Sequence, residues 1–187
     1  TLPADDGVEC AFHAIEIADG SRSIDVGTSV SVDVIPKFGR WEAAALAASP
    51  RVAARPDILG GVPGLWLSPD TPRRRGLFLH GGGYSLGSSA THAGFAGRLA
   101  AALSMGLFSI DYRLAPERPF PAAFEDGLAA LRAHNQAVWL IGDSAGGGLG
   151  LALAVALPEK VRGVVAFSPW VDLALTAPSF IENAAQD

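Results

Sequence analysis

From residue 62 onward the chain alternates short apolar runs with segments of helical periodicity. The apolar runs, such as GLFL at 76–79 and AVWLI at 137–141, lack the apolar–polar alternation of a half-exposed strand. Continuous apolar strands are buried on both faces, and parallel strands need crossover helices between them. The pattern therefore predicts an α/β fold with a mostly parallel sheet and helices on both faces.

The individual elements follow from the same pattern. We expect strands at 62–68, 75–80, 106–112, 137–143 and 161–169, and helices at 93–103, 121–134 and 145–157. The second helix is the best defined, because Pro121 stands at a first helical position and acidic residues follow it early. This helix is expected to cover one face of the sheet.

The first part of the chain has a different pattern. Residues 1–48 alternate apolar and polar residues around turn-rich stretches, which predicts a β-rich N-terminal segment, interpreted as a possible small separate module. Within it, the alanine-rich stretch Trp41–Ala48 predicts a short helix. Residues 49–61, rich in proline and glycine, are expected to be a connector, and 62–187 the α/β core.

A serine stands in a glycine-flanked turn of this core. The segment GDSAG at 142–146 fits G-x-S-x-G and lies between a predicted strand and a predicted helix. At so sharp a turn, a side chain at Gly142 or Gly146 would collide with the strand or the helix. The turn holds the serine hydroxyl beside a helix N-terminus, which favours negative charge. We interpret Ser144 as a nucleophile; the alternative is a tight turn with the serine as helix cap.

A second glycine motif, HGGGY at 80–84, directly follows the strand at 75–80. Consecutive glycines can turn their N–H groups into one concavity and let a substrate oxyanion approach without a Cβ in the way. Oxyanion donors must lie about 3 Å from the charge that develops. Gly82, Gly83 and Ala145 are our candidate donors, and the alternative is a flexible loop or a phosphate cradle.

Four motifs together, HGGGY, DYRLAPERPFPAAFED, GDSAGGGL and SPWVDL, resemble the hormone-sensitive-lipase-like branch of the α/β-hydrolases. The similarity spans 62–180 and implies a serine carboxylesterase or lipase-like hydrolase of small-molecule esters, with a Ser–His–Asp triad and neither metal nor cofactor. Matched position by position, Ser144 is the nucleophile, and Gly82, Gly83 and Ala145 are the oxyanion donors. His80 matches the histidine that braces the glycine loop.

Several charged residues resemble an acid–base cluster but have a structural interpretation. Asp111, Arg113 and Glu117 lie at a strand end and in the following loop, where charged groups pair to fix the shape of the loop. Asp143 is expected to stabilise the turn beside the serine, and Asp172 to stabilise the loop after the last strand.

Four further side chains have no motif-based assignment. Tyr84 and Trp170 are expected either to line an acyl pocket or to belong to the core. No motif supports a function for His92 or His134.

The general base is missing from the expected place. A serine hydroxyl needs a base to take its proton, and in α/β-hydrolases the order is serine, acid, histidine. After Ser144 the chain contains Glu159, Asp172, Glu182 and Asp187 but no histidine. We therefore expect the triad acid and histidine beyond residue 187, and a core incomplete at its C-terminus. A missing C-terminal part, completion by another segment and a degenerate hydrolase that binds a ligand or partner all remain open.

Residues 1–45 also resemble part of a cold-shock domain, which would place Phe12 and His13 on a nucleic-acid stacking strand. The alternative is a β-rich extension of the hydrolase domain. The formal net charge of −5 argues against nucleic-acid binding, because a phosphate backbone would be repelled, although a local basic patch remains compatible.

Cysteine content and hydropathy bear on location. Cys10 is the only cysteine, which excludes an intrachain disulfide and fits a reducing compartment, so a cytoplasmic location is expected. No secretory signal is evident at the start of the sequence, and the longest apolar stretch, 149–157, is about half of the ~20 residues that span a bilayer. We expect no membrane span; a homo-oligomer stays open.

Overall fold

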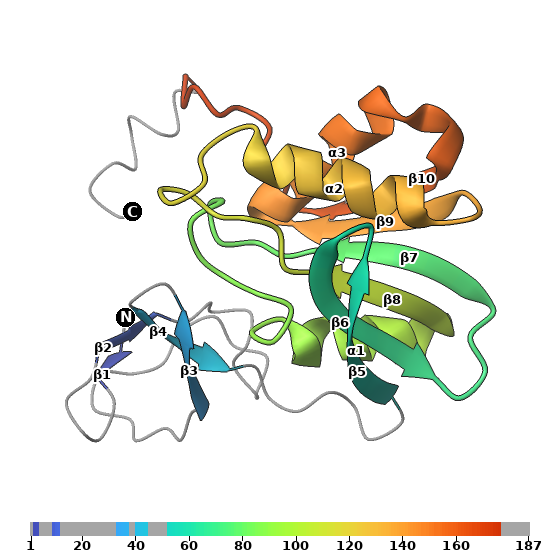
Figure 1. The fold of residues 1–187 in the computed structure, drawn as a ribbon, viewed down its shortest axis with the longest axis horizontal. Helices are drawn as coiled ribbons and strands as arrows, with labels where there is room; N and C mark the ends of the chain where they lie inside the picture. Colours follow the sequence, from blue (N-terminus) through green and yellow to red (C-terminus); the bar gives the residue numbers. More distant parts are fainter. Residues whose placement is uncertain (1, 4–8, 12–32, 38–39, 45–51, 177–187) are drawn as a thin grey trace.

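The computed structural model describes residues 2–3, 9–11, 33–37, 40–44 and 52–176 (Figure 1). They form a four-stranded sheet in the order β1-β2-β4-β3 and a six-stranded sheet in the order β10-β9-β7-β8-β6-β5. The six-stranded sheet and its helices form the α/β core that the sequence predicts.

The four-stranded sheet confirms the β-rich character of the N-terminal segment. Its strands are β1 (Leu2–Pro3), β2 (Glu9–Ala11), β3 (Asp33–Lys37) and β4 (Arg40–Ala44). The predicted helix at 41–48 is wrong for 41–44, which lie in β4, and residues 45–48 lie outside the described part. β4 pairs with both β2 and β3, and these two ladders of hydrogen bonds override the helix propensity of alanine, which is high but contributes little free energy per residue. Phe12 and His13 lie outside the described residues.

The six-stranded sheet is mixed. Its strands are β5 (Val52–Leu59), β6 (Val62–Pro69), β7 (Arg74–Leu79), β8 (Met105–Ile110), β9 (Val138–Asp143) and β10 (Val161–Phe167). The last four strands run parallel to one another, whereas β5 and β6 are antiparallel to their neighbours. The sheet is therefore mostly parallel, as predicted.

Residues 52–59, which the sequence predicts to be connector, form the edge strand β5. Pro56 is tolerated there because an edge strand needs ladder hydrogen bonds on one side only. The strand returns into β6 through Gly60 and Gly61, both at positive φ, as a two-residue hairpin turn requires. Prolines and glycines thus mark an edge hairpin here rather than a connector.

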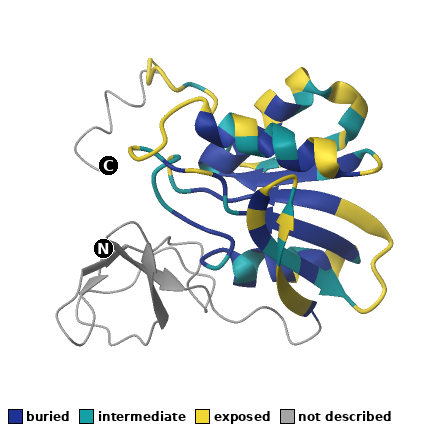
Figure 2. Ribbon diagram, in the orientation of Figure 1, coloured by how far each residue is buried: buried dark blue, intermediate teal, exposed yellow. Residues whose placement is uncertain are grey.

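Helices cover both faces of the sheet (Figure 1). They are α1 (Ala93–Leu103), α2 (Ala122–Ala133) and α3 (Ser144–Ala156), and a short 3₁₀ turn, η2 (Pro158–Lys160), precedes β10. Along β7, Leu77 and Leu79 pack into the core beneath α2 and α3, whereas Phe78 packs into the core beneath α1. Figure 2 shows the central strands buried on both sides. No helix within the described residues is long and apolar enough to cross a bilayer.

Candidate active site

Ser144 lies at the junction of β9 and α3, and its backbone φ is +50°. A non-glycine residue in this left-handed region stores about 1–3 kcal/mol of strain, which a well-packed surrounding must hold in place. A Cβ at Gly142 would lie 2.5 Å from the carbonyl carbon of Gly146, so only glycine fits there. The serine itself is half-buried, so its side chain remains accessible at the carboxyl edge of the sheet.

The glycine loop follows β7. Gly82 has φ +115° and Gly83 has φ +61°, conformations that residues with side chains rarely adopt. The carbonyl of Gly82 accepts hydrogen bonds from the N–H groups of Ser85 (3.0 Å) and Leu86 (2.9 Å), which fold the loop back on itself. Gly82 is required by this turn, because a Cβ there would lie 2.6 Å from the carbonyl carbon of Leu86.

The glycine loop and the serine turn contact each other directly. The N–H of Gly81 donates to Asp143 Oδ1 at 2.9 Å, in the residue next to the serine. Gly146 packs against the carbonyl oxygens of Leu79 and His80, so closely that no side chain would fit. These contacts bring the loop to the first turn of α3, whose N–H groups have no acceptor within the helix. Gly82, Gly83 and Ala145 therefore lie on elements that meet, and their role as oxyanion donors stays a prediction.

His80 supports the contact between the glycine loop and the serine turn from inside the core. Its ring is fully buried, its Nδ1 lies 2.8 Å from the carbonyl oxygen of Gly81, and it stacks on Tyr112 with ring centroids 4.2 Å apart. The hydroxyl of Tyr112 donates to the carbonyl of His80 at 2.5 Å. Burial, together with the charges of Tyr84 and Asp143, raises the pKa of Tyr112 well above its ordinary value, so the hydroxyl keeps the proton it donates.

A second histidine lies beside the serine turn. His92 and Asp143 are both buried, and His92 Nε2 lies 3.8 Å from Asp143 Oδ2. The rings of His80 and His92 are 5.4 Å apart. The sequence assigned no function to His92, and no motif could have placed it, because its pairing with Asp143 depends on how α1 packs against the sheet.

The loop after β10 also contacts the serine turn. The N–H of Trp170 donates to the carbonyl of Ser144 at 2.8 Å, and the Trp170 ring lies 6.2 Å from that of Tyr84. Burial raises the pKa of Tyr84. Asp172 holds the loop by accepting hydrogen bonds from the Thr176 N–H and hydroxyl, both at 2.8 Å. The backbone of Trp170 is therefore held at the serine turn, the ring of Tyr84 lies near that of Trp170, and Asp172 has the structural role that the sequence predicts.

The charged residues after β8 also act in structure. Asp111 accepts hydrogen bonds from the Ser89 N–H (2.6 Å) and hydroxyl (2.8 Å), which anchors the segment before α1. Arg113 pairs with Asp126 at 2.8 Å and with Glu125 at 3.2 Å, which ties the loop to α2 and raises the pKa of the guanidinium. Glu117 is exposed. Neither Asp111 nor Arg113 is placed beside the serine by these contacts.

Three histidines belong to the described part of the chain. His80 lies under the glycine loop and His92 against Asp143, whereas His134 ends α2 near Trp66, with ring centroids 6.1 Å apart. Burial, together with Arg75 and Lys160, lowers the pKa of His134 to about 4. Among the described residues no three His, Cys, Asp or Glu side chains gather as a metal site would require.

The chain is similar in sequence to a known family and to known proteins. Residues 76–187 match the family model described as alpha/beta hydrolase fold. The chain is 38% identical to an acetyl-hydrolase of Streptomyces hygroscopicus over 133 residues, which are 65% of this chain and 44% of that protein.

Two solved structures are similar. The HSL homologue EstE7 from a metagenome library is 40% identical with a TM-score of 0.69, over 75% of this chain and 52% of that one. EstE5, whose crystal was soaked with p-nitrophenyl butyrate, is 36% identical with a TM-score of 0.69, over 76% of this chain and 53% of that one. The chain thus spans about half the length of the proteins it matches.

Proposed function

Because this chain belongs to the α/β-hydrolase fold family, we propose that it is a serine hydrolase of small-molecule carboxylic esters with Ser144 as nucleophile. The contact between the serine turn and the glycine loop carries the proposal: the Gly81 N–H binds Asp143 Oδ1 at 2.9 Å, one residue from Ser144. Similar proteins bear the names acetyl-hydrolase and esterase, and EstE5 was soaked with a butyrate ester. We therefore propose that the substrates of this protein are esters with a short acyl chain.

In the proposed mechanism, the Ser144 oxygen attacks the ester carbonyl carbon and the carbonyl oxygen becomes an oxyanion. The N–H groups of Gly82, Gly83 and Ala145 donate to that oxyanion, in a preorganised arrangement that needs no rearrangement during the reaction. Collapse of the tetrahedral species expels the alcohol and leaves an acyl-serine. Water then attacks the acyl-serine and releases the carboxylic acid.

Attack requires a base that takes the hydroxyl proton and later protonates the leaving alcohol. In the described contacts, His80 lies against the glycine loop and His92 lies beside Asp143. His134 lies at the C-terminal end of α2, near Trp66. We propose that the catalytic histidine and its acid are contributed by residues outside those the structure describes.

The test is hydrolysis of p-nitrophenyl butyrate by the full encoded protein and by its Ser144→Ala variant. The proposal expects turnover that falls to background in Ser144→Ala. Ser104→Ala is the matched control, because Ser104 ends α1 and its backbone, not its hydroxyl, makes the described cap contacts. The absence of turnover in the wild type would overturn the proposal and favour a catalytically incomplete protein that binds a ligand or partner.

A further inference from the structure

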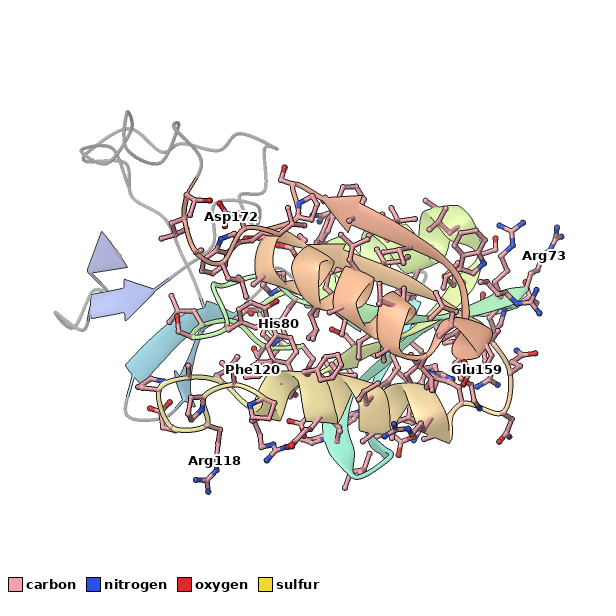
Figure 3. The ribbon with its side chains drawn as sticks, turned by 90° about the horizontal axis from the view of Figure 1, so that it is seen from above. Arg73, His80, Arg118, Phe120, Glu159 and Asp172 are labelled. Carbon is pink, nitrogen blue, oxygen red and sulfur yellow. The ribbon has the colours of Figure 1, made fainter. Side chains whose placement is uncertain are left out.

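Arginines gather at the end of the sheet away from Ser144. Arg73 precedes β7, Arg74 and Arg75 begin it, and Arg162 is the second residue of β10. These are the amino ends of the parallel strands, whereas Ser144 follows the carboxyl end of β9. At about 3.3 Å per residue, β9 separates the two ends by roughly 17 Å. Figure 3 shows Arg73 at the opposite end of the molecule from His80 and Asp172.

Two adjoining cavities open among these arginines, with volumes of about 520 Å³ and about 820 Å³. Both are lined by Arg73, Arg74, Arg75 and Gln136. The smaller cavity adds Trp66 among its lining residues, and the larger adds Trp139 and Arg162. Volumes of this size suit a small-molecule ligand.

Arg73, Arg74 and Arg75 have no negatively charged partner among the residues that the structure describes. Within the described residues, no aspartate or glutamate lines either cavity, and no ion pair involves Arg73, Arg74 or Arg75. By contrast, Arg55, which also lines the smaller cavity, pairs with Asp57 at 2.8 Å. An uncompensated positive cluster in a chain of net charge −5 favours an external anion.

Neighbouring groups hold Arg75 and Arg162 in position, and the pKa of a nearby histidine responds to the positive charge. The Arg75 guanidinium lies 5.5 Å from the Trp66 ring centroid, and Arg162 Nε donates to the carbonyl of Ala137 at 3.0 Å. Arg75 is also one of the charges that lower the pKa of the buried His134. The positive field therefore reaches from the exposed cavities into the adjacent core.

Trp139 gives the larger cavity an aromatic wall. Its ring packs over Gly163 of β10, where a Cβ would lie 2.6 Å from the ring carbon Cζ3. The glycine thus lets the indole lie against the sheet beside Arg162. Aromatic rings next to guanidinium groups can receive both the flat and the charged part of a ligand.

We propose that these arginine-lined cavities bind a small molecule carrying two or more linked phosphate groups. A guanidinium donates two parallel hydrogen bonds to a phosphate, and several guanidiniums from β7 and β10 match the several charges of a pyrophosphate unit. Gln136 adds a neutral side-chain amide at the same rim. The site is separate from Ser144 and independent of the proposed ester hydrolysis.

The test is calorimetric titration of the full encoded protein with inorganic pyrophosphate at low ionic strength. We expect a Kd below about 1 mM, and binding at least tenfold weaker in the double variant R74Q/R75Q. Both side chains are exposed, so folding is expected to persist, and circular dichroism checks it. If R74Q/R75Q does not fold, the variant R74K/R75K tests the proposal in its place. Lysine keeps the positive charge but cannot make the paired hydrogen bonds, so weaker binding of pyrophosphate is again expected.

Arg118→Gln is the matched control, because Arg118 is exposed, carries no described ion pair and lies far from Arg73 (Figure 3). Citrate provides a carboxylate anion of comparable charge and is expected to bind at least tenfold more weakly than pyrophosphate. Tighter binding of ADP than of pyrophosphate would support the proposal and assign the aromatic wall to a base.

Three titration results would each overturn the proposal. They are no heat of binding with pyrophosphate up to about 10 mM, equal binding in wild type and R74Q/R75Q, or equal affinity for citrate. Retention on phosphatidylglycerol vesicles that pyrophosphate does not displace would also overturn it, in favour of a lipid surface. Each readout is binding and not ester hydrolysis, so none of these results bears on Ser144 as a nucleophile.

Discussion

Replacing Gly146 by alanine tests whether contact between the serine turn and the glycine loop positions the candidate site. The new Cβ would lie 2.5 Å from the carbonyl oxygen of His80 and closer still to that of Leu79. Both are backbone atoms at the end of β7, so they cannot rotate away as a side chain could. Ordinary contact begins at 3.4 Å, so relief of the closer contact, with the carbonyl oxygen of Leu79, requires β7 and α3 to separate by more than about 1 Å.

That separation draws the Ala145 N–H away from Gly82 and Gly83. A misplacement of about 1 Å costs on the order of 100-fold in rate, and removal of one oxyanion donor costs about 100- to 1,000-fold. We therefore expect kcat for p-nitrophenyl butyrate to fall about 100-fold in Gly146→Ala. Overpacking is expected to lower the free energy of unfolding by about 1–3 kcal/mol, measured by urea denaturation.

Gly150→Ala is the matched control in the same helix. Its Cβ would meet Leu79 Cδ1 at 3.3 Å, a side-chain atom that can move, and alanine gains up to about 1 kcal/mol in helix propensity. Activity is expected to stay within about twofold of wild type. A folded Gly146→Ala protein with wild-type kcat would refute the reasoning, as would an equal loss in both variants.

Three further changes test the serine turn, the support of the glycine loop and the buried His134. In Asp143→Ala the Gly81 N–H loses its acceptor, so kcat should fall roughly tenfold or more with little change in KM; an unchanged kcat would contradict the positioning role. Tyr112→Phe leaves the buried carbonyl of His80 without its donor and should cost about 1–3 kcal/mol in urea denaturation, whereas equal stability would show that another donor replaces it. The pKa of His134 falls from 6.5 to about 4 on folding, so the unfolded state binds more protons between these values and stability should drop as the pH falls across them. His134→Gln should flatten that part of the stability profile, and an unaltered profile would assign the slope to other groups.

Local patterns predicted the helices closely. The helices expected at 93–103, 121–134 and 145–157 are observed at Ala93–Leu103, Ala122–Ala133 and Ser144–Ala156. Long segments of consistent periodicity carry their own structural signal. The stretches predicted wrongly, 41–44 and 52–59, are strands. Their extended conformation is stabilised by pairing with β3 and β6, and no local pattern in the two stretches shows this pairing.

The candidate site was predictable where a motif encodes backbone geometry. Glycines on both sides of Ser144 and in the loop after β7 reveal conformations and close approaches that side chains forbid. The Gly81–Asp143 bond joins residues 62 positions apart, and the contact of His92 with Asp143 likewise depends on tertiary packing. No local pattern records such contacts, so they emerged only from the fold.

The most direct test of the central claim is to trap the acyl-enzyme. The full encoded protein is mixed with p-nitrophenyl butyrate, quenched in acid within the first turnovers, digested and analysed by mass spectrometry. The account predicts a butyryl group on the peptide that contains Ser144, lost in Ser144→Ala and retained in the Ser104→Ala control. Ester turnover with no acyl group on Ser144, or with the group on another residue, would contradict it.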